Sequence, residues 1–158
     1  MDLKFTFGGA SPDHHDHGGA PSGVSLPLTA KPISLSPPST VLEIVVRREA
    51  ATLIAEAVSG DGVTYGRAEV PLAPRTEEAA SAPDPTALAK GVRSAAARVV
   101  AELEGPMADS VTGLALELGD STTEVLSALG LDTATPVVDA ALQRRAGIAM
   151  GTPIRISA

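Results

Sequence analysis

Three short stretches between residues 40 and 71 are rich in β-branched and aliphatic residues, and turn-forming residues separate them. Residues 40–48 follow a Pro-Pro-Ser sequence and read as a first strand. We expect a bend at Arg47-Arg48-Glu49 and a second strand over residues 51–58. The sequence Ser59-Gly60-Asp61-Gly62 then predicts a tight turn, because Asp-Gly accepts the positive φ angles of hairpins. Residues 63–71 complete a predicted three-strand meander.

A pattern with helical spacing begins at Asp84-Pro85. Asp84 is the expected N-cap, and Pro85 fits the first helical position. Apolar residues recur at three- and four-residue steps on one face: Leu88, Val92, Ala95, Ala96, Val99, Val100 and Leu103. Gly105-Pro106 stops the helix, which is predicted over residues 85–104. Burying four of its Val and Leu side chains is worth about 6–12 kcal/mol in gross terms, so this helix is expected to be the main cover of the sheet.

Residues 111–118 are predicted to form a fourth strand, with leucines at the alternate positions 114, 116 and 118 on one face. A strand that returns after a helix usually lies parallel in the same sheet. Short helices are expected at residues 122–129 and 136–145, and residues 153–157 form either a last short strand or a loose tail. The fold class is therefore α/β, with a mixed sheet built from a meander, a crossover helix and a parallel strand.

Residues 1–40 differ from the rest of the chain in composition. Gly, Pro, Ser and His are frequent over residues 8–40, and hydrophobic residues are too sparse to offset about 1–2 kcal/mol of backbone entropy for each ordered residue. We predict a flexible N-terminal arm over residues 1–40 and a single α/β domain over residues 41–158.

Composition narrows the function classes. The net charge of −7 and the scattered Lys and Arg residues argue against nucleic-acid binding. The chain has no cysteine and no apolar run of about 20 residues, and its N-terminus lacks the pattern of a signal peptide, so we expect a cytoplasmic protein without a membrane segment. Aromatic residues are 2% of the chain, which predicts a thin core that is modestly stable alone or completed by a partner.

The order of these elements resembles the opening of the FGGY carbohydrate kinases, in the actin-like ATPase superfamily. The segments that carry the resemblance are the third strand ending in EVPL, the proline-led helix, VTGLAL, and LQRRAGIAMGTPIRISA, over residues 41–158. The resemblance implies a ribonuclease-H-like, actin-like half-domain.

The chain differs from that family at the positions of the family's phosphate loop and catalytic residue. The family's first hairpin carries an Asp-x-Gly-Thr-Thr phosphate loop, whereas this chain has EIVVRREAAT, in which Glu43 alone matches the Asp loosely and Thr52 falls beyond the bend. The family's catalytic Asp has only Asp139 as a counterpart here, too close to Gly147. We therefore expect no catalytic residue: the chain is a truncated, non-catalytic relative, or a kinase-like subunit that needs a partner chain.

All three histidines lie in one cluster, His14, His15 and His17, beside Asp13 and Asp16. Imidazoles and carboxylates are ligands for Zn or Ni, and this is the one metal site that the sequence offers. The alternative is a solvated patch, because adjacent ligands on a floppy chain have no second shell to orient them.

The first residues form a strand-like pattern. Leu3, Phe5 and Phe7 alternate with polar residues before Gly8-Gly9. This segment is predicted to bind a partner by adding to the edge of its sheet; the alternative is the edge of the chain's own sheet.

Two further candidates come from the region after the fourth strand. Glu117 and Asp120 stand where α/β folds gather functional groups, with a loop acid as the alternative. The stretch GDSTTE predicts either an anion-binding turn or a capping box between Ser121 and Glu124.

With no catalytic set assigned, we expect a binding or scaffold subunit that acts through a protein partner or self-association. The alternatives are a metal-binding accessory protein that uses the His cluster, and a partial kinase subunit that completes an active site with another chain.

Overall fold

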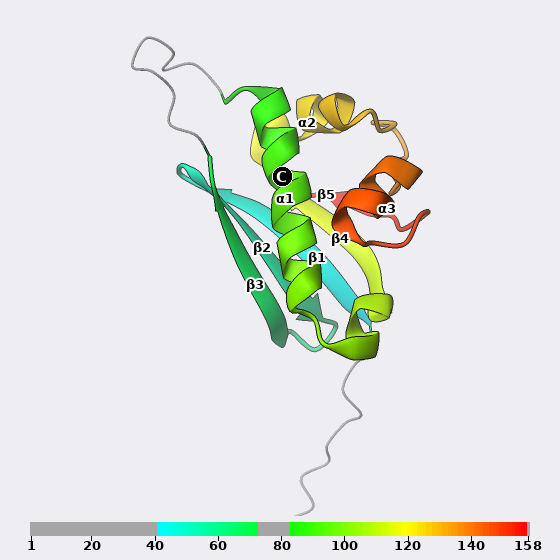
Figure 1. Ribbon diagram of the computed structural model, residues 1–158. Coiled ribbons are helices and arrows are strands. Elements are labelled where there is room, and N and C mark those ends of the chain that lie inside the picture. Colours follow the sequence, from blue (N-terminus) through cyan, green and yellow to red (C-terminus); the bar gives the residue numbers. More distant parts are fainter. Residues whose placement is uncertain (1–40, 73–82, 158) are drawn as a thin grey trace, which may run out of the picture. The chain divides into compact units, whose positions relative to one another are not determined.

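The computed structural model describes residues 41–72 and 83–157. These residues form a mixed five-stranded sheet in the order β3-β2-β1-β4-β5, with helices beside it (Figure 1). The mixed α/β fold expected from the sequence is confirmed.

The first three strands form the predicted antiparallel meander. They are β1 (Leu42–Glu49), β2 (Thr52–Ser59) and β3 (Thr64–Pro71). The Asp-Gly turn lies between β2 and β3, where Gly62 has a φ of 84° and its N–H donates to the Ser59 carbonyl over 2.9 Å. A glycine fits this left-handed conformation because it has no Cβ.

Helix α1 (Pro85–Glu102) leads from the meander to β4 (Val111–Glu117), which lies parallel to β1. Asp84 is the N-cap, as predicted, and accepts a hydrogen bond from the Thr86 N–H over 3.2 Å. The helix ends two residues earlier than expected, because Leu103 is already extended, and a 3-10 helix η1 (Gly105–Ser110) precedes the strand.

The last part of the chain adds two short helices and an edge strand. These are α2 (Thr122–Leu129), α3 (Ala140–Ala146) and β5 (Ile154–Ile156), which pairs parallel to β4. Of the two readings for residues 153–157, the short strand is therefore the one observed. Helix α3 begins four residues later than residue 136, at an N-cap formed by Asp139.

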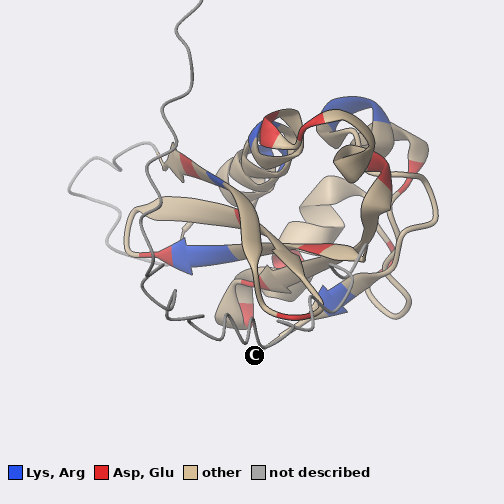
Figure 2. Cartoon of the chain, turned by 90° about the horizontal axis from the view of Figure 1, so that it is seen from below, with Lys and Arg blue, Asp and Glu red and all other residues tan. Residues whose placement is uncertain are grey.

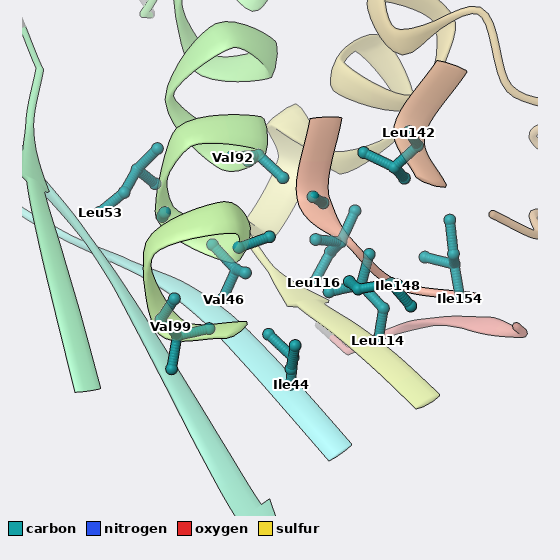
Figure 3. Close-up of a cluster of buried hydrophobic side chains, with 14 of the residues drawn as sticks. Ile44, Val46, Leu53, Val92, Val99, Leu114, Leu116, Leu142, Ile148 and Ile154 are labelled. Carbon is teal, nitrogen blue, oxygen red and sulfur yellow. The ribbon is translucent and has the colours of Figure 1, made fainter. Parts of the chain in front are cut away.

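The hydrophobic core lies between the helices and one face of the sheet. Strand residues of this face, such as Ile44, Val46, Leu114 and Leu116, point toward Val92 of α1 and other helical side chains (Figure 3). Every member of this set is fully buried. The core is aliphatic throughout, and α1 supplies six of its residues, which confirms that α1 is the main cover of the sheet.

Two local predictions were wrong. Arg47, Arg48 and Glu49 belong to β1, and the chain turns at Ala50 and Ala51 instead, because the β1–β2 register continues to the pair Glu49 and Thr52.

The capping box between Ser121 and Glu124 does not form. Ser121 ends the 3-10 helix η2 (Gly119–Ser121) with helical backbone angles and makes no side-chain cap. The Thr122 hydroxyl donates to the Gly119 carbonyl instead, over 2.8 Å.

Candidate functional site

The sheet has a second face, which we call the open face, and strand alternation decides which residues lie on it. Because successive side chains of a strand point to opposite sides, the residues between the buried core positions lie there. In the part of the chain that the structure describes, the α-helices lie on the other side of the sheet (Figure 2). The open face is formed by Glu43, Val45, Arg47, Ile54, Glu56, Val58, Arg67, Glu69, Ala115, Glu117 and Arg155.

Both basic and acidic residues occur along the strands (Figure 2), and on the open face several of them form ion pairs. Arg47 of β1 pairs with Glu56 of β2 and with Glu49 of its own strand. Arg67 of β3 reaches Glu56 and Glu69, with N–O distances of 2.9 Å to each. Glu56 therefore accepts from arginines on both neighbouring strands, and its side chain is only 15% exposed. This arrangement ties the three strands of the meander together.

The ion pairs hold Glu56, Arg47 and Arg67 in the charged form. The hydrogen bond from Arg47 lowers the pKa of Glu56 below its ordinary value, although burial acts in the opposite direction. Hydrogen bonds to carboxylates in turn raise the pKa of Arg47 and Arg67. A general acid needs a carboxyl that keeps its proton near neutral pH, so Glu56 is the opposite of such a group. Its surroundings favour binding over proton transfer.

A second ion pair stands apart from this network, at the other side of the open face. Arg155 of β5 donates from both guanidinium arms to the two carboxylate oxygens of Glu43, and the Nε–Oε1 distance is 2.7 Å. The pair crosses over β4 at Gly113, where an added Cβ would lie 3.3 Å from Glu43 Oε1. The missing side chain of Gly113 thus makes room for the Glu43 carboxylate.

The same part of the face is hollowed. The hollow has a volume of about 390 Å³, and its walls are mostly apolar, with Val41, Val45, Val58 and Pro153 around the Glu43–Arg155 pair. Val41 is 51% exposed although it is a large hydrophobic residue. Concave apolar surface with a few fixed polar groups is the usual character of a binding site.

The turn that would hold nucleotide phosphates in the resembled kinases has a different form here. It consists of Ala50 and Ala51, and Ala50 adopts a positive φ of 51°. The Arg48 guanidinium donates to the Ala50 carbonyl over 3.1 Å. Glu43 lies far along β1 from this turn, in the hollow, and Thr52 is the first residue of β2.

The other candidates from the sequence have local structural settings. Asp139 caps α3 by accepting a hydrogen bond from the Leu142 N–H over 2.7 Å. Glu117 ends β4 on the open face, opposite Arg47, and Asp120 lies in η2.

The remaining predicted site residues lie outside the described residues. These are Leu3, Phe5 and Phe7 of the strand-like segment and His14, His15 and His17 of the histidine cluster. Over residues 41–72 and 83–157, no group of three or more His, Cys, Asp or Glu side chains is placed to hold a metal ion. In the same ranges, no helix combines the length and apolar character needed to cross a membrane.

Sequence reasoning missed the open face as a site. Its signal is present as charged residues at alternate strand positions, with Glu43 and Arg47 on β1 and Glu56 on β2. Which of them pair depends on the register between strands, and a one-residue slip would separate them.

Comparisons with known proteins add no family. A scan against protein-family models finds no match, and a search of the curated proteins finds none either.

Proposed function

We propose that this chain is a non-catalytic binding subunit that associates with a second copy of itself through the open face. The observation that carries the proposal is the open face: an apolar hollow beside a network of paired charges, on a sheet whose other face already holds the core. Most of the charged groups of this face are held in fixed positions by ion pairs, so a partner meets a charge pattern that is already ordered.

The charge pattern favours a second copy as the partner. The open face carries both signs: β1 and β3 each contribute an arginine and a glutamate, β2 contributes Glu56, and β5 contributes Arg155. A surface that carries both signs can oppose its own copy about a two-fold axis, with arginines of one copy near glutamates of the other. The apolar walls of the hollow, Val41, Val45 and Val58, supply the contact area that ion pairs alone do not provide.

The proposal extends to ancestry. The strand order β3-β2-β1-β4-β5, with β4 parallel to β1 after a helix, agrees with the layout that the FGGY resemblance implies. The alanine turn after β1 departs from that family at its phosphate loop. Together these features support a sugar-kinase-like or actin-like half-domain that has the sheet of that superfamily and functions by binding another protein chain.

Sedimentation velocity over a wide range of protein concentrations tests the function. We expect a reversible rise in the average mass with concentration. Val45→Lys places a charge in the wall of the hollow and is expected to shift the monomer–dimer equilibrium toward monomer by at least tenfold, about 1.4 kcal/mol. Ala128→Lys makes a similar change on an exposed position of α2 and should leave the equilibrium unchanged.

A monomer at every concentration would overturn the proposal. An equilibrium that responds equally to Val45→Lys and Ala128→Lys would show that copies meet through another surface, which overturns the assignment of the open face.

A further inference from the structure

The regular pairing of the described sheet is interrupted at two steps, and both lie at the hollow of the open face. Thr112 is an extra residue of β4 opposite the step from Leu42 to Glu43, and Tyr65 is an extra residue of β3 opposite the step from Ala57 to Val58. One residue of each step lines the hollow, as does Thr112. Because bulges of this kind redirect side chains, they are frequent beside binding and active sites. Two of them at one hollow favour a ligand site.

The ion pair in the hollow presents two full charges of opposite sign side by side. Arg155 donates to Glu43 from Nε and Nη2, so its Nη1 takes no part in the pair. The Arg155 side chain is 64% exposed and that of Glu43 is 28% exposed. Each carboxylate oxygen can accept more than one hydrogen bond. Both groups can therefore contact a ligand while they remain paired with each other.

This charge arrangement selects among classes of ligand. A ligand with one negative charge is attracted by Arg155 and repelled by Glu43, and a ligand with one positive charge meets the reverse. A zwitterion contacts both groups with opposite charges, through charge-assisted hydrogen bonds at each end. Free α-amino acids carry an ammonium group and a carboxylate on one carbon atom, so their two charges are as close together as those of the ion pair.

The walls and the size of the hollow indicate the rest of the ligand. Val41, Val45, Val58 and Pro153 are aliphatic, and a polar side chain placed against them would lose water without gaining a hydrogen bond. The volume of about 390 Å³ lies near the lower end of the range of about 300–1,000 Å³ that is typical of small-molecule sites. The hollow therefore suits a small ligand with an apolar side chain.

We propose that the hollow binds a free apolar α-amino acid, whose ammonium group contacts Glu43 and whose carboxylate contacts Arg155. The side chain of the ligand lies against Val41, Val45 and Val58. The bound ligand covers apolar area that a second copy of the chain would use, so it favours the monomer. This second consequence rests on the proposed function, whereas the binding itself does not.

An NMR titration of the ¹⁵N-labelled full chain tests the site, with L-leucine as the probe. We expect saturable shifts of the amide signals of Val45, Val58 and Gly113, which line the hollow, and little change at Val125 in α2. 4-Methylpentanoate lacks the ammonium group and 3-methylbutylamine lacks the carboxylate, so each should bind at least tenfold more weakly. L-Serine keeps both charges but lacks the apolar side chain, and it should also bind at least tenfold more weakly.

Two substitutions should exchange the ligand preference. Glu43→Gln should weaken leucine binding at least tenfold and strengthen the binding of 4-methylpentanoate, because the repelling carboxylate is gone. Arg155→Gln should also weaken leucine binding and should strengthen that of 3-methylbutylamine. Glu69→Gln removes an open-face carboxylate that pairs with Arg67 outside the hollow, and as the matched control it should leave all affinities unchanged. A variant that gains one ligand while it loses another is still folded.

Two results would overturn the site. One is the lack of any saturable shift with leucine. The other is equal affinity for leucine and for both single-charge analogues, which would mean that the hollow accepts any apolar group and that Glu43 and Arg155 recognise nothing.

Sedimentation velocity with and without saturating leucine keeps this proposal distinct from the proposed function. A shift toward monomer on addition of leucine supports both. Charge-dependent leucine binding by a chain that is monomeric at every concentration retains the site and overturns the proposed function. Self-association without leucine binding retains the function and overturns the site, whereas leucine binding that leaves the dimer unchanged overturns the competition between them.

Discussion

Gly91 of α1 shows how closely helix and sheet approach. A Cβ at this position would lie 2.6 Å from Leu53 Cδ1 and 3.2 Å from Leu72 Cδ2. Leu53 is fully buried, so its side chain has little room to move. The absence of a side chain at residue 91 therefore sets the distance between α1 and β2.

Gly91→Ala is expected to destabilise the protein despite the better helix propensity of alanine. Overpacking costs about 1–3 kcal/mol, and the propensity gain of about 1 kcal/mol offsets part of it, leaving a net loss of up to about 2 kcal/mol. Urea unfolding measures this as a lower midpoint. In a Leu53→Val background the clashing atom is gone, so the same substitution should become neutral or stabilising; an unchanged loss there would contradict the steric account.

Glu56 makes the free energy of unfolding depend on pH, and the direction of that dependence follows from the lowered pKa of its carboxyl group. Because its pKa is lowered in the folded state, its contribution to stability is complete above the pKa of the unfolded chain and is lost as the pH falls through the folded value. Glu56→Gln should therefore remove part of the stability at neutral pH and flatten the decline that sets in as the pH falls below the ordinary pKa of a glutamate.

The measurement is the free energy of unfolding by urea at a series of pH values. Glu124→Gln removes an exposed carboxylate from α2 and serves as the control, with a pH profile close to that of the unchanged protein. Parallel profiles for Glu56→Gln and the unchanged chain would mean that the ion pairs with Arg47 and Arg67 do not act on stability.

At the scale of elements, the sequence predicted most of the fold. Strands, the Asp-Gly turn and α1 carry strong local signals, such as alternating β-branched residues and the Asp84-Pro85 start, and they lie within a few residues of their expected places. The β1–β2 turn was misplaced because Ala50 and Ala51 are not turn-forming residues: pairing of the two strands forces Ala50 to a φ of 51°. Tertiary pairing overrides local preference there, and no sequence pattern reports it.

The edge strand β3 is held by side chains of α1 as well as by β2. Arg98 and Glu102 occupy an outward carbonyl and an outward N–H of this strand. Edge strands with open backbone groups invite pairing with other chains, so these two contacts should suppress aggregation.

Removing both contacts tests this role. Arg98→Ala combined with Glu102→Ala should speed aggregation on mild heating, with a rise in thioflavin T signal, while the stability of the monomer changes by only about 1 kcal/mol. Lys90→Ala combined with Glu104→Ala removes the same two charges at exposed positions. Equal aggregation rates for the two double variants would show that charge loss alone, not the β3 edge, is responsible.

For the whole molecule, the sheet that the resemblance to the kinases predicts is present, whereas the residues of their phosphate loop are not. The predicted mixed sheet is present, but the open face could not be assigned from the sequence. Its ion pairs join residues of different strands, and the paired Glu43 and Arg155 are 112 residues apart. What the sequence did indicate is the missing phosphate loop. That point leads to a prediction for the complete chain.

Titration of the full chain with MgATP should give no saturable heat. Phosphate binding at a hairpin relies on glycines that let the backbone approach and on hydroxyls that donate, whereas the turn after β1 has two alanine methyl groups and a carbonyl already bonded to Arg48. A weak response from surface arginines would rise linearly and fade with salt, because exposed charges are screened. Saturable binding that survives salt and disappears in Ala50→Glu would instead place a nucleotide at this turn, and the non-catalytic reading of the fold would then be wrong.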